Sequence, residues 1–185
     1  MRDLDVRNAV RGELSRIHLG DQDTRIIEEM GIWSSTARID IAVVNGELCG
    51  FELKSARDNL KRLPDQEAIY SAVFDRVTLV TAENHLVASL KVIPEWWGVS
   101  IASTLQDTVF VTPERRPEFN PTLSALMVAR LLWRDEALSI LAERGLDRGY
   151  RSKPVAMLHQ HLANSMAISD LRNQTRAKLK SRNYN

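Results

Sequence analysis

Several features that would identify a class of protein are scarce in this chain of 185 residues. A single cysteine, Cys49, excludes an internal disulfide, and four scattered histidines do not indicate a structural zinc site. The glycine-rich patterns of dinucleotide sites and nucleotide-driven motors are absent. The start of the chain is charged where a secretory signal has an apolar stretch, and no long apolar run follows. We therefore expect a cytoplasmic protein without a membrane segment.

The chain also has almost no excess of one charge, because 25 lysines and arginines face 24 acids and the formal net charge is +1. That total averages two regions, since residues 1–144 carry −5 and residues 145–185 carry +6. Such a local excess is typical both of a phosphate-binding surface and of a solvated helix face. The cations of this basic tail, which we predict to bind nucleic acid, are Arg148, Arg151, Lys153, Arg172, Arg176, Lys178, Lys180 and Arg182.

Hydrophobic spacing predicts an α/β fold that ends in helices. The helices and strands expected in the first part are, in order, residues 6–17, 38–44, 47–54, 60–74, 76–81, 99–102 and 108–111. The helices expected after Pro121 are residues 123–133, 136–144, 154–162 and 170–180. A strand, a crossover helix and a further strand imply a mixed or parallel central sheet flanked by helices. We place the domain boundary after residue 118, with a helical, basic region over 119–185.

Some features favour structural roles. The four histidines are expected at the surface, Cys49 as a buried thiol, the Trp96-Trp97 pair in a core, and Ser169 as the cap of the last helix. A stripe of apolar residues in the helical region fits either core packing or self-association as a homodimer. Its members are Leu123, Leu126, Met127, Leu131 and Leu132.

The chemistry-bearing residues lie on the predicted hairpin, which Asn45-Gly46 closes as a two-residue turn. In that register Asp40 lies opposite Phe51 and beside Glu52, so two carboxylates come close enough to share one divalent cation. Mg²⁺ prefers hard oxygen ligands and keeps several waters. Asp40, Glu52 and the main-chain carbonyl of Leu53 would supply such ligands.

Lys54 lies on the same face as Glu52, because side chains alternate along a strand. Gln66 and Tyr70 are spaced i, i+4 and share one face of the following helix. The alternative is a purely structural role, in which the charges lie on a solvated strand pair and Lys54 forms a salt bridge. Against it, these charges interrupt strands that are otherwise apolar, and buried acids require a partner. The pattern therefore indicates a site for a metal and an ammonium group.

The residues RID at 38–40, FELKS at 51–55 and QEAIY at 66–70 resemble the PD-(D/E)XK nuclease superfamily, in its RecB-like branch with a QxxxY motif. The wider run from RIDIAVVNG through ELKSxRDxLxRLPxQ to DRVTLV is similar to a small bacterial and phage family within that superfamily. The family pattern has a glycine shortly before this run, and Gly31, several residues earlier, is its best match here. The resemblance implies a restriction-endonuclease-like αβββαβ core that cuts DNA or RNA with Mg²⁺ or Mn²⁺.

The resemblance also implies roles for particular residues. Asp40 and Glu52 would be metal ligands, Lys54 the catalytic lysine, and Gln66 and Tyr70 the helix motif. An upstream acid that assists the metal would be Glu29, with Glu28 or Glu13 as competitors.

The sequence thus predicts a phosphodiesterase that depends on Mg²⁺ or Mn²⁺ and acts on nucleic acid, most simply DNA, in repair or phage defence. Any unwinding of a duplex would require a helicase or another protein partner. The competing prediction is a catalytically silent nucleic-acid-binding or adaptor protein with a nuclease-like fold, because members of the superfamily have lost cleavage.

Overall fold

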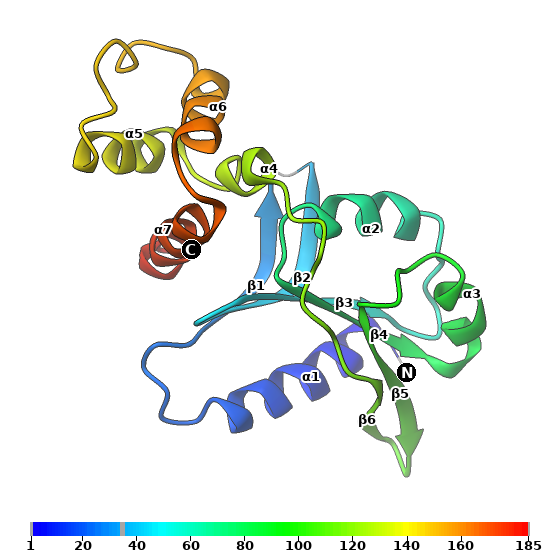
Figure 1. Cartoon of the computed structure of the whole chain (residues 1–185). Helices are drawn as coiled ribbons and strands as arrows, with labels where there is room; N and C mark the ends of the chain where they lie inside the picture. Colours follow the sequence, from blue (N-terminus) through cyan, green and yellow to red (C-terminus); the bar gives the residue numbers. More distant parts are fainter. Residues whose placement is uncertain (1, 34–35, 185) are drawn as a thin grey trace. The chain divides into compact units, whose positions relative to one another are not determined.

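The computed structural model describes residues 2–33 and 36–184 and divides into two units, residues 1–122 and 123–185. The elements of the first unit (Figure 1) are α1 (Asp3–Ile17), β1 (Arg25–Ile32), β2 (Ala37–Val44), β3 (Leu48–Lys54), α2 (Leu63–Ser71), β4 (Arg76–Ala82), η1 (Glu83–His85), α3 (Leu86–Leu90), β5 (Gly98–Leu105) and β6 (Thr108–Arg115). The predicted α/β class, with a helical C-terminal region, is confirmed. The boundary expected from the sequence, after residue 118, differs slightly from the observed division.

The six strands form one mixed sheet in the order β1-β2-β3-β4-β5-β6. β3 and β4 are parallel, as are β4 and β5, whereas the other neighbours are antiparallel. The parallel pairs require crossovers, which α2 and α3 supply. This places β3, which carries the candidate site, next to the β4 strand that the first crossover delivers.

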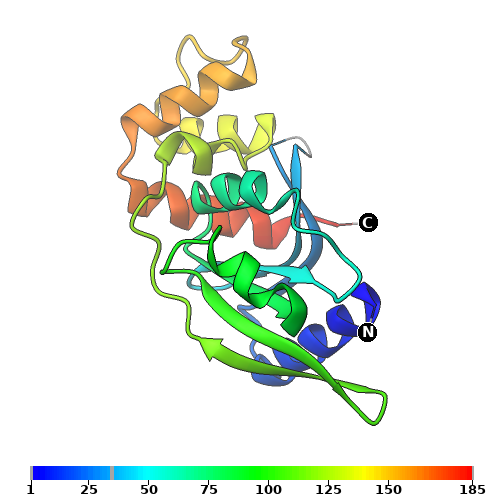
Figure 2. The ribbon, with the colours of Figure 1, turned by 90° about the vertical axis from the view of Figure 1, so that its right-hand side faces the viewer.

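The sheet has a helix on each face (Figures 1 and 2). On one face α1 packs its apolar stripe, including Val6 and Val10, against Leu53 of β3 and its neighbours. On the other, a Cβ on Gly50 would lie 3.1 Å from the ring of Phe74, which follows α2. Successive residues of a strand point to opposite faces. Glu52 and Lys54, like Gly50, therefore lie on the face that α2 covers.

The β2–β3 hairpin differs from its predicted form. Its loop has three residues, Asn45 to Glu47, because the Glu47 amide donates to the Asn45 side chain at 3.0 Å while the Asn45 amide donates to the Glu47 carbonyl. The register pairs Ile41 with Phe51, so the predicted pairing of Asp40 with Phe51 is wrong by one residue. The extra loop residue shifts Asp40 toward the position opposite Glu52.

The strand β1 was not expected from the residue pattern. Its exposed and buried residues do not alternate regularly, because Glu29 has a φ of +53° in the middle of the strand. That left-handed conformation is uncommon for a residue other than glycine and interrupts the period of two on which the prediction relied.

The second unit contains four helices: α4 (Ala125–Ala129), α5 (Arg134–Glu143), α6 (Val155–Ser165) and α7 (Ile168–Ser181). A buried apolar cluster, with Leu132, Ile140 and Leu158 among its members, holds them together. Leu123 packs against the same cluster, so core packing accounts for much of the predicted apolar stripe. None of the helices in the described parts of the chain has the length and apolar character needed to cross a bilayer.

The structural roles predicted for the tryptophan pair, the histidines, Ser169 and Cys49 are confirmed only in part. Trp96 and Trp97 are buried as predicted. His159 is not at the surface, because it lies within hydrogen-bonding distance of the Leu132 carbonyl, 3.0 Å away, and burial lowers its pKa. The cap of α7 is Ala167 rather than Ser169, which lies inside the helix. Cys49 is only partly buried.

Candidate active site

A cavity of about 630 Å³ opens between α1, the β1–β3 strands and α2. Its walls include the predicted catalytic and metal-binding residues except Tyr70, which is buried behind Glu52. The other lining residues come from the start of α1, from the start of β2, from the segment that joins β3 to α2, and from α2 itself. The topology therefore gathers polar residues from three strands and two helices around one opening.

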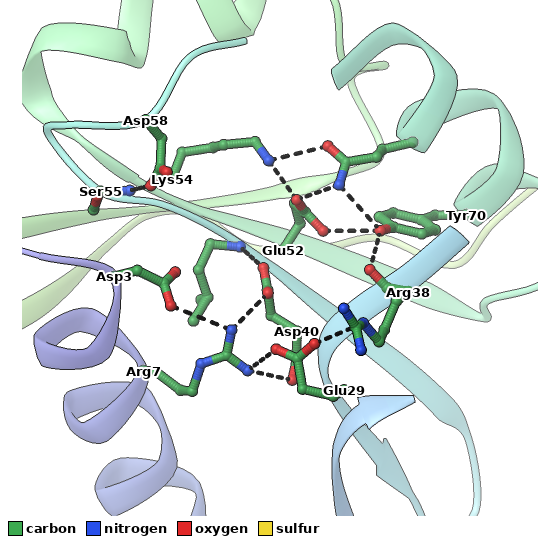
Figure 3. Close-up of polar contacts among 12 residues, drawn as sticks. Asp3, Arg7, Glu29, Arg38, Asp40, Glu52, Lys54, Ser55, Asp58 and Tyr70 are labelled. Carbon is green, nitrogen blue, oxygen red and sulfur yellow. Dashed lines mark hydrogen bonds and ion pairs between the residues drawn. The ribbon is translucent and has the colours of Figure 1, made fainter. Parts of the chain in front are cut away.

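The buried side of the cavity is a hydrogen-bonded network centred on Glu52 (Figure 3). Lys54 Nζ donates to Glu52 Oε1 at 2.5 Å and to Gln66 Oε1 at 3.0 Å. Gln66 Nε2 donates to Glu52 Oε1 at 2.6 Å, and the Tyr70 hydroxyl lies 2.9 Å from Glu52 Oε2. Only 2% of Glu52 is exposed, so these donors replace the water that a carboxylate otherwise needs.

The second carboxylate, Asp40, is held from two directions. The Leu53 amide donates to its Oδ2 at 2.7 Å, which fixes the carboxylate beside the residue that follows Glu52. Arg7 Nη2 of α1 lies 2.8 Å from its Oδ1, and the aspartate side chain is 18% exposed. Asp40 thus remains accessible from the cavity while its orientation is set by the main chain of β3.

Arg7 joins the outer wall into one ion-pair cluster. Besides Asp40, it pairs with Asp3 one helical turn earlier and with Glu29 of β1, whose other carboxylate oxygen is 2.8 Å from Arg38 Nε. The left-handed backbone of Glu29 lies in this cluster. Such conformations cost about 1–3 kcal/mol each and persist where the surroundings impose them, commonly at functional sites.

Burial changes the acidity of both central carboxylates. Desolvation, and next the neighbouring charge of Asp40, raise the pKa of Glu52 to about 7 against the opposing effect of Lys54. Desolvation also raises the pKa of Asp40, although the Leu53 amide and Arg7 act in the opposite direction. The pKa of Tyr70 is raised as well, chiefly by desolvation, so its hydroxyl keeps its proton. Neither carboxyl group ionises readily while the other is nearby and both are buried, and a cation bound beside them would favour the ionised form of both.

The Glu52 pKa predicts how stability depends on pH. The folded chain holds this proton up to about pH 7, whereas the unfolded chain releases it near 4.5. Folding therefore takes up a proton between these values, and the Glu52 contribution to stability falls as the pH rises from about 4.5 to 7. Glu52→Gln removes this group and keeps an oxygen that accepts from Lys54. We expect the variant to gain stability relative to wild type as the pH rises through this interval.

Urea unfolding of both proteins at pH 5 and pH 8 checks this expectation. Glu95→Gln, which changes an exposed glutamate, is the matched control and should show no such trend. An equal difference between Glu52→Gln and wild type at the two pH values contradicts the prediction.

The donor set suits a small, hard cation. Asp40 and Glu52 offer carboxylate oxygens, and a Mg²⁺ site with one or two carboxylates is completed by waters. Over residues 2–33 and 36–184 no group of three or more His, Cys, Asp or Glu side chains is arranged to hold a metal ion. The carboxylate oxygens of Asp40 and Glu52 are the type of ligand that Mg²⁺ or Mn²⁺ prefers, and further ligands would have to come from water or the main chain.

Of the three acids considered for the assisting role, Glu29 lines this cavity. Glu28 instead pairs with Arg11 at 3.2 Å, and Glu13 lines a different cavity between α1 and the sheet. The residues Asp40, Glu52, Lys54 and Gln66 are brought together as the sequence predicts. Arg7 was missed, although its i, i+4 spacing from Asp3 was a visible signal.

Most cations of the basic tail already make interactions with other residues. Arg182 donates to Glu136 and to the Leu131 carbonyl, both at 2.7 Å, and its guanidinium lies over the Trp133 ring. Arg151 pairs with Asp147, Lys178 with Ser139 and Glu143, and Arg176 with Asn173. Arg172 and Lys180 also make interactions. Within the described chain, the charged ends of Arg148 and Lys153 have no such partner.

The chain is similar in sequence to one described family and to one curated protein. A sequence model of the family described as bacteriophage P4 protein cII matches residues 2–185. Protein cII of Enterobacteria phage P4 is 45% identical over 60 residues, which are 32% of this chain and 23% of that protein. The match therefore spans less than a quarter of the length of that curated relative.

Two solved structures resemble the chain more distantly. A protein of unknown function from Silicibacter pomeroyi, SPO1766, is 16% identical with a TM-score of 0.47, over 83% of this chain and 96% of that one. SfsA of Pyrococcus furiosus, solved with Ca²⁺, is 12% identical with a TM-score of 0.34, over 61% of each chain.

Proposed function

The chain belongs to the bacteriophage P4 protein cII family, and from the side chains gathered in its first unit we propose that it is a metal-dependent nuclease. The substrate is nucleic acid, most simply DNA, cut in the cytoplasm by hydrolysis of phosphodiester bonds. The resemblance of the RID, FELKS and QEAIY segments to PD-(D/E)XK nucleases supports the same proposal.

One observation carries it: two carboxylates with raised pKa values and a buried lysine share one open cavity. Lys54 is 4% exposed and Glu52 2%, and a purely structural salt bridge gains little from such burial because desolvation offsets the attraction. Asp40 lines the same cavity and its side chain is more exposed, at 18%. The arrangement is costly for stability and suited to binding a cation beside an ammonium group.

In this proposal each residue has a definite task. Asp40, Glu52 and the Leu53 carbonyl would hold Mg²⁺ or Mn²⁺, and the bound metal would supply an acidified water and neutralise charge on the phosphate. Lys54 Nζ, fixed by Glu52 and Gln66, orients the attacking water and stabilises the negative charge that develops on the phosphate. Gln66 is a positioning residue, because its amide fixes both Lys54 and Glu52.

A second function is favoured by Arg7. Its guanidinium already neutralises Asp40 and Glu29, so the same fold serves a catalytically silent nucleic-acid-binding or adaptor protein if a metal does not displace it. Assembly with a helicase or with a second copy of the chain is compatible with either function.

A cleavage assay separates the two functions. We expect the 185-residue chain to degrade or nick circular and linear DNA, single- or double-stranded, with Mg²⁺ or Mn²⁺, and EDTA to stop the reaction. Binding without cleavage in either metal contradicts the nuclease and supports the adaptor.

Metal binding is tested independently of turnover by Asp40→Asn. The asparagine still accepts from the Leu53 amide but lacks the negative charge that attracts the cation. We expect Mn²⁺ to raise the melting temperature of wild type and to have little effect on this variant. Asp107→Asn, in the exposed β5–β6 turn, is the control that should keep the shift. A full shift in Asp40→Asn argues against the assigned ligands.

A further inference from the structure

The segment that joins Lys54 to Gln66 carries cations that the site does not use. Residues 55–62, here called the 55–62 loop, include Arg57, Lys61 and Arg62 and one acid, Asp58. All three cations are exposed, and within the described chain their charged ends have neither a hydrogen-bond nor an ion-pair partner. The basic tail differs, because six of its eight cations make a hydrogen bond, an ion pair or another interaction.

The 55–62 loop has a defined conformation. The Ser55 amide donates to Asp58 Oδ2 at 2.7 Å, and the Asp58 amide donates back to the Ser55 carbonyl at 3.2 Å (Figure 3). The Lys61 amide donates to the Asn59 side chain, and Asn84 donates to the Ala56 carbonyl. The acid of the loop, Asp58, is thus hydrogen-bonded within the loop, and these bonds together fix the turns of the loop. The three cations are therefore presented on an ordered scaffold next to the catalytic lysine.

Arg62 connects this loop to the cavity. Six acids and four cations line the cavity, and three of those cations, Arg7, Arg38 and Lys54, are already paired with carboxylates. Arg62 lines the same wall as Gln66, and among the described lining residues it is the cation whose side chain has no carboxylate partner. A phosphate that approaches this predominantly acidic opening therefore meets an available positive charge at Arg62 and along the loop.

From this contrast we infer that the 55–62 loop, rather than the basic tail, is the principal contact for the phosphodiester backbone of the nucleic acid. The inference rests on the proposed function for the identity of the ligand. Arg57, Lys61 and Arg62 bind successive phosphates, and this contact is independent of base sequence because it is made to the backbone. Since Lys54 and Gln66 flank the loop, a backbone held there is delivered to the carboxylates.

The test is DNA binding by the 185-residue chain in which all three loop cations are replaced by alanine. The variants are made in a Lys54→Ala background so that a fluorescent oligonucleotide, single- or double-stranded, stays intact with Mg²⁺ present. Arg62 precedes α2 without a side-chain capping bond, so its replacement removes no cap. The control replaces Arg16, Lys91 and Arg116, which are also exposed, lie in the same unit and have no charge partner in the described chain.

We expect the loop variant to bind about 10–100-fold more weakly than its parent, and the dependence of log K on log salt to become shallower by about 2–3. The control has the same net charge and should bind within about twofold of the parent. Equal weakening in both variants, unchanged binding by the loop variant, or no binding by the parent overturns the inference.

The outcome is distinct from that of the nuclease proposal. Loss of binding in the loop variant supports the 55–62 loop even if the wild type cuts no DNA. Conversely, wild-type cleavage together with full binding by the loop variant supports the nuclease proposal and shows that the DNA backbone is bound by another part of the chain. Replacing Arg148 and Lys153 of the tail then tests that region directly, and a larger loss there also overturns the inference.

Discussion

Lys54→Ala should slow DNA cleavage by about 10²–10⁴-fold, the range typical of removing a positioned group that moves or orients a proton. Lys54 Nζ donates to both Glu52 and Gln66, and in the proposed mechanism it orients the water that attacks the phosphate. Binding of DNA should change little, because the proposed backbone contacts lie in the 55–62 loop. Rates on a supercoiled plasmid and anisotropy with an oligonucleotide measure the two effects.

Two further variants make that result specific. Lys54→Met keeps the apolar stem and removes only the charge, so an equal loss in both variants shows that a packing defect is not the cause. Lys91→Ala removes an exposed lysine of the same unit and should cut at the wild-type rate. Cleavage by Lys54→Ala at the wild-type rate overturns the assigned role.

Arg7→Gln should have the largest effect on the metal-free protein. Arg7 is 13% exposed and Asp40 18%, so the substitution leaves a largely buried carboxylate without its cation. We expect the free energy of unfolding in EDTA to fall by about 2 kcal/mol, below the 3–5 typical of a fully buried pair. Because the guanidinium and a metal compete for Asp40, Mn²⁺ should bind about tenfold more tightly to the variant.

Urea unfolding in EDTA and calorimetric titration with Mn²⁺ measure the two parts of this prediction. Arg11→Gln is the matched control, since Arg11 lies one turn further along α1 and pairs with Glu28, outside the cavity. Its metal affinity should equal that of wild type. An Arg7→Gln protein that binds Mn²⁺ no better than wild type shows that the arginine does not compete for the site.

How much of the site was predictable depended on sequence separation. Asp40, Glu52 and Lys54 belong to one hairpin, and Gln66 and Tyr70 to the next helix, so local periodicity was enough to bring them together. Arg7 is 33 residues from Asp40, and only the packing of α1 against the sheet joins them. A pattern read along one segment contains no information about that contact.

The secondary structure was likewise predicted correctly for some elements and wrongly for others. Strands with a continuous apolar run, such as β4, were predicted almost to the residue, whereas β1 was missed because the left-handed Glu29 breaks its alternation. The hairpin was predicted with the wrong register, because a side-chain bond of Asn45 lengthens the turn. The basic tail was predicted to bind nucleic acid from its charge alone, and charge does not reveal that Arg182 already forms an ion pair with Glu136.

The register of the β2–β3 hairpin decides on which face of the sheet the site lies. Strand residues alternate between faces, so a shift of β3 by one position against β2 would turn Phe51 and Leu53 toward α2, and Glu52 and Lys54 toward α1. A deletion within the three-residue loop can be absorbed by a two-residue turn, which keeps the pairing of Val44 with Leu48. A deletion inside β3, between Leu48 and Glu52, cannot be absorbed in that way, so the site should tolerate a change in loop length far better than a change in strand length.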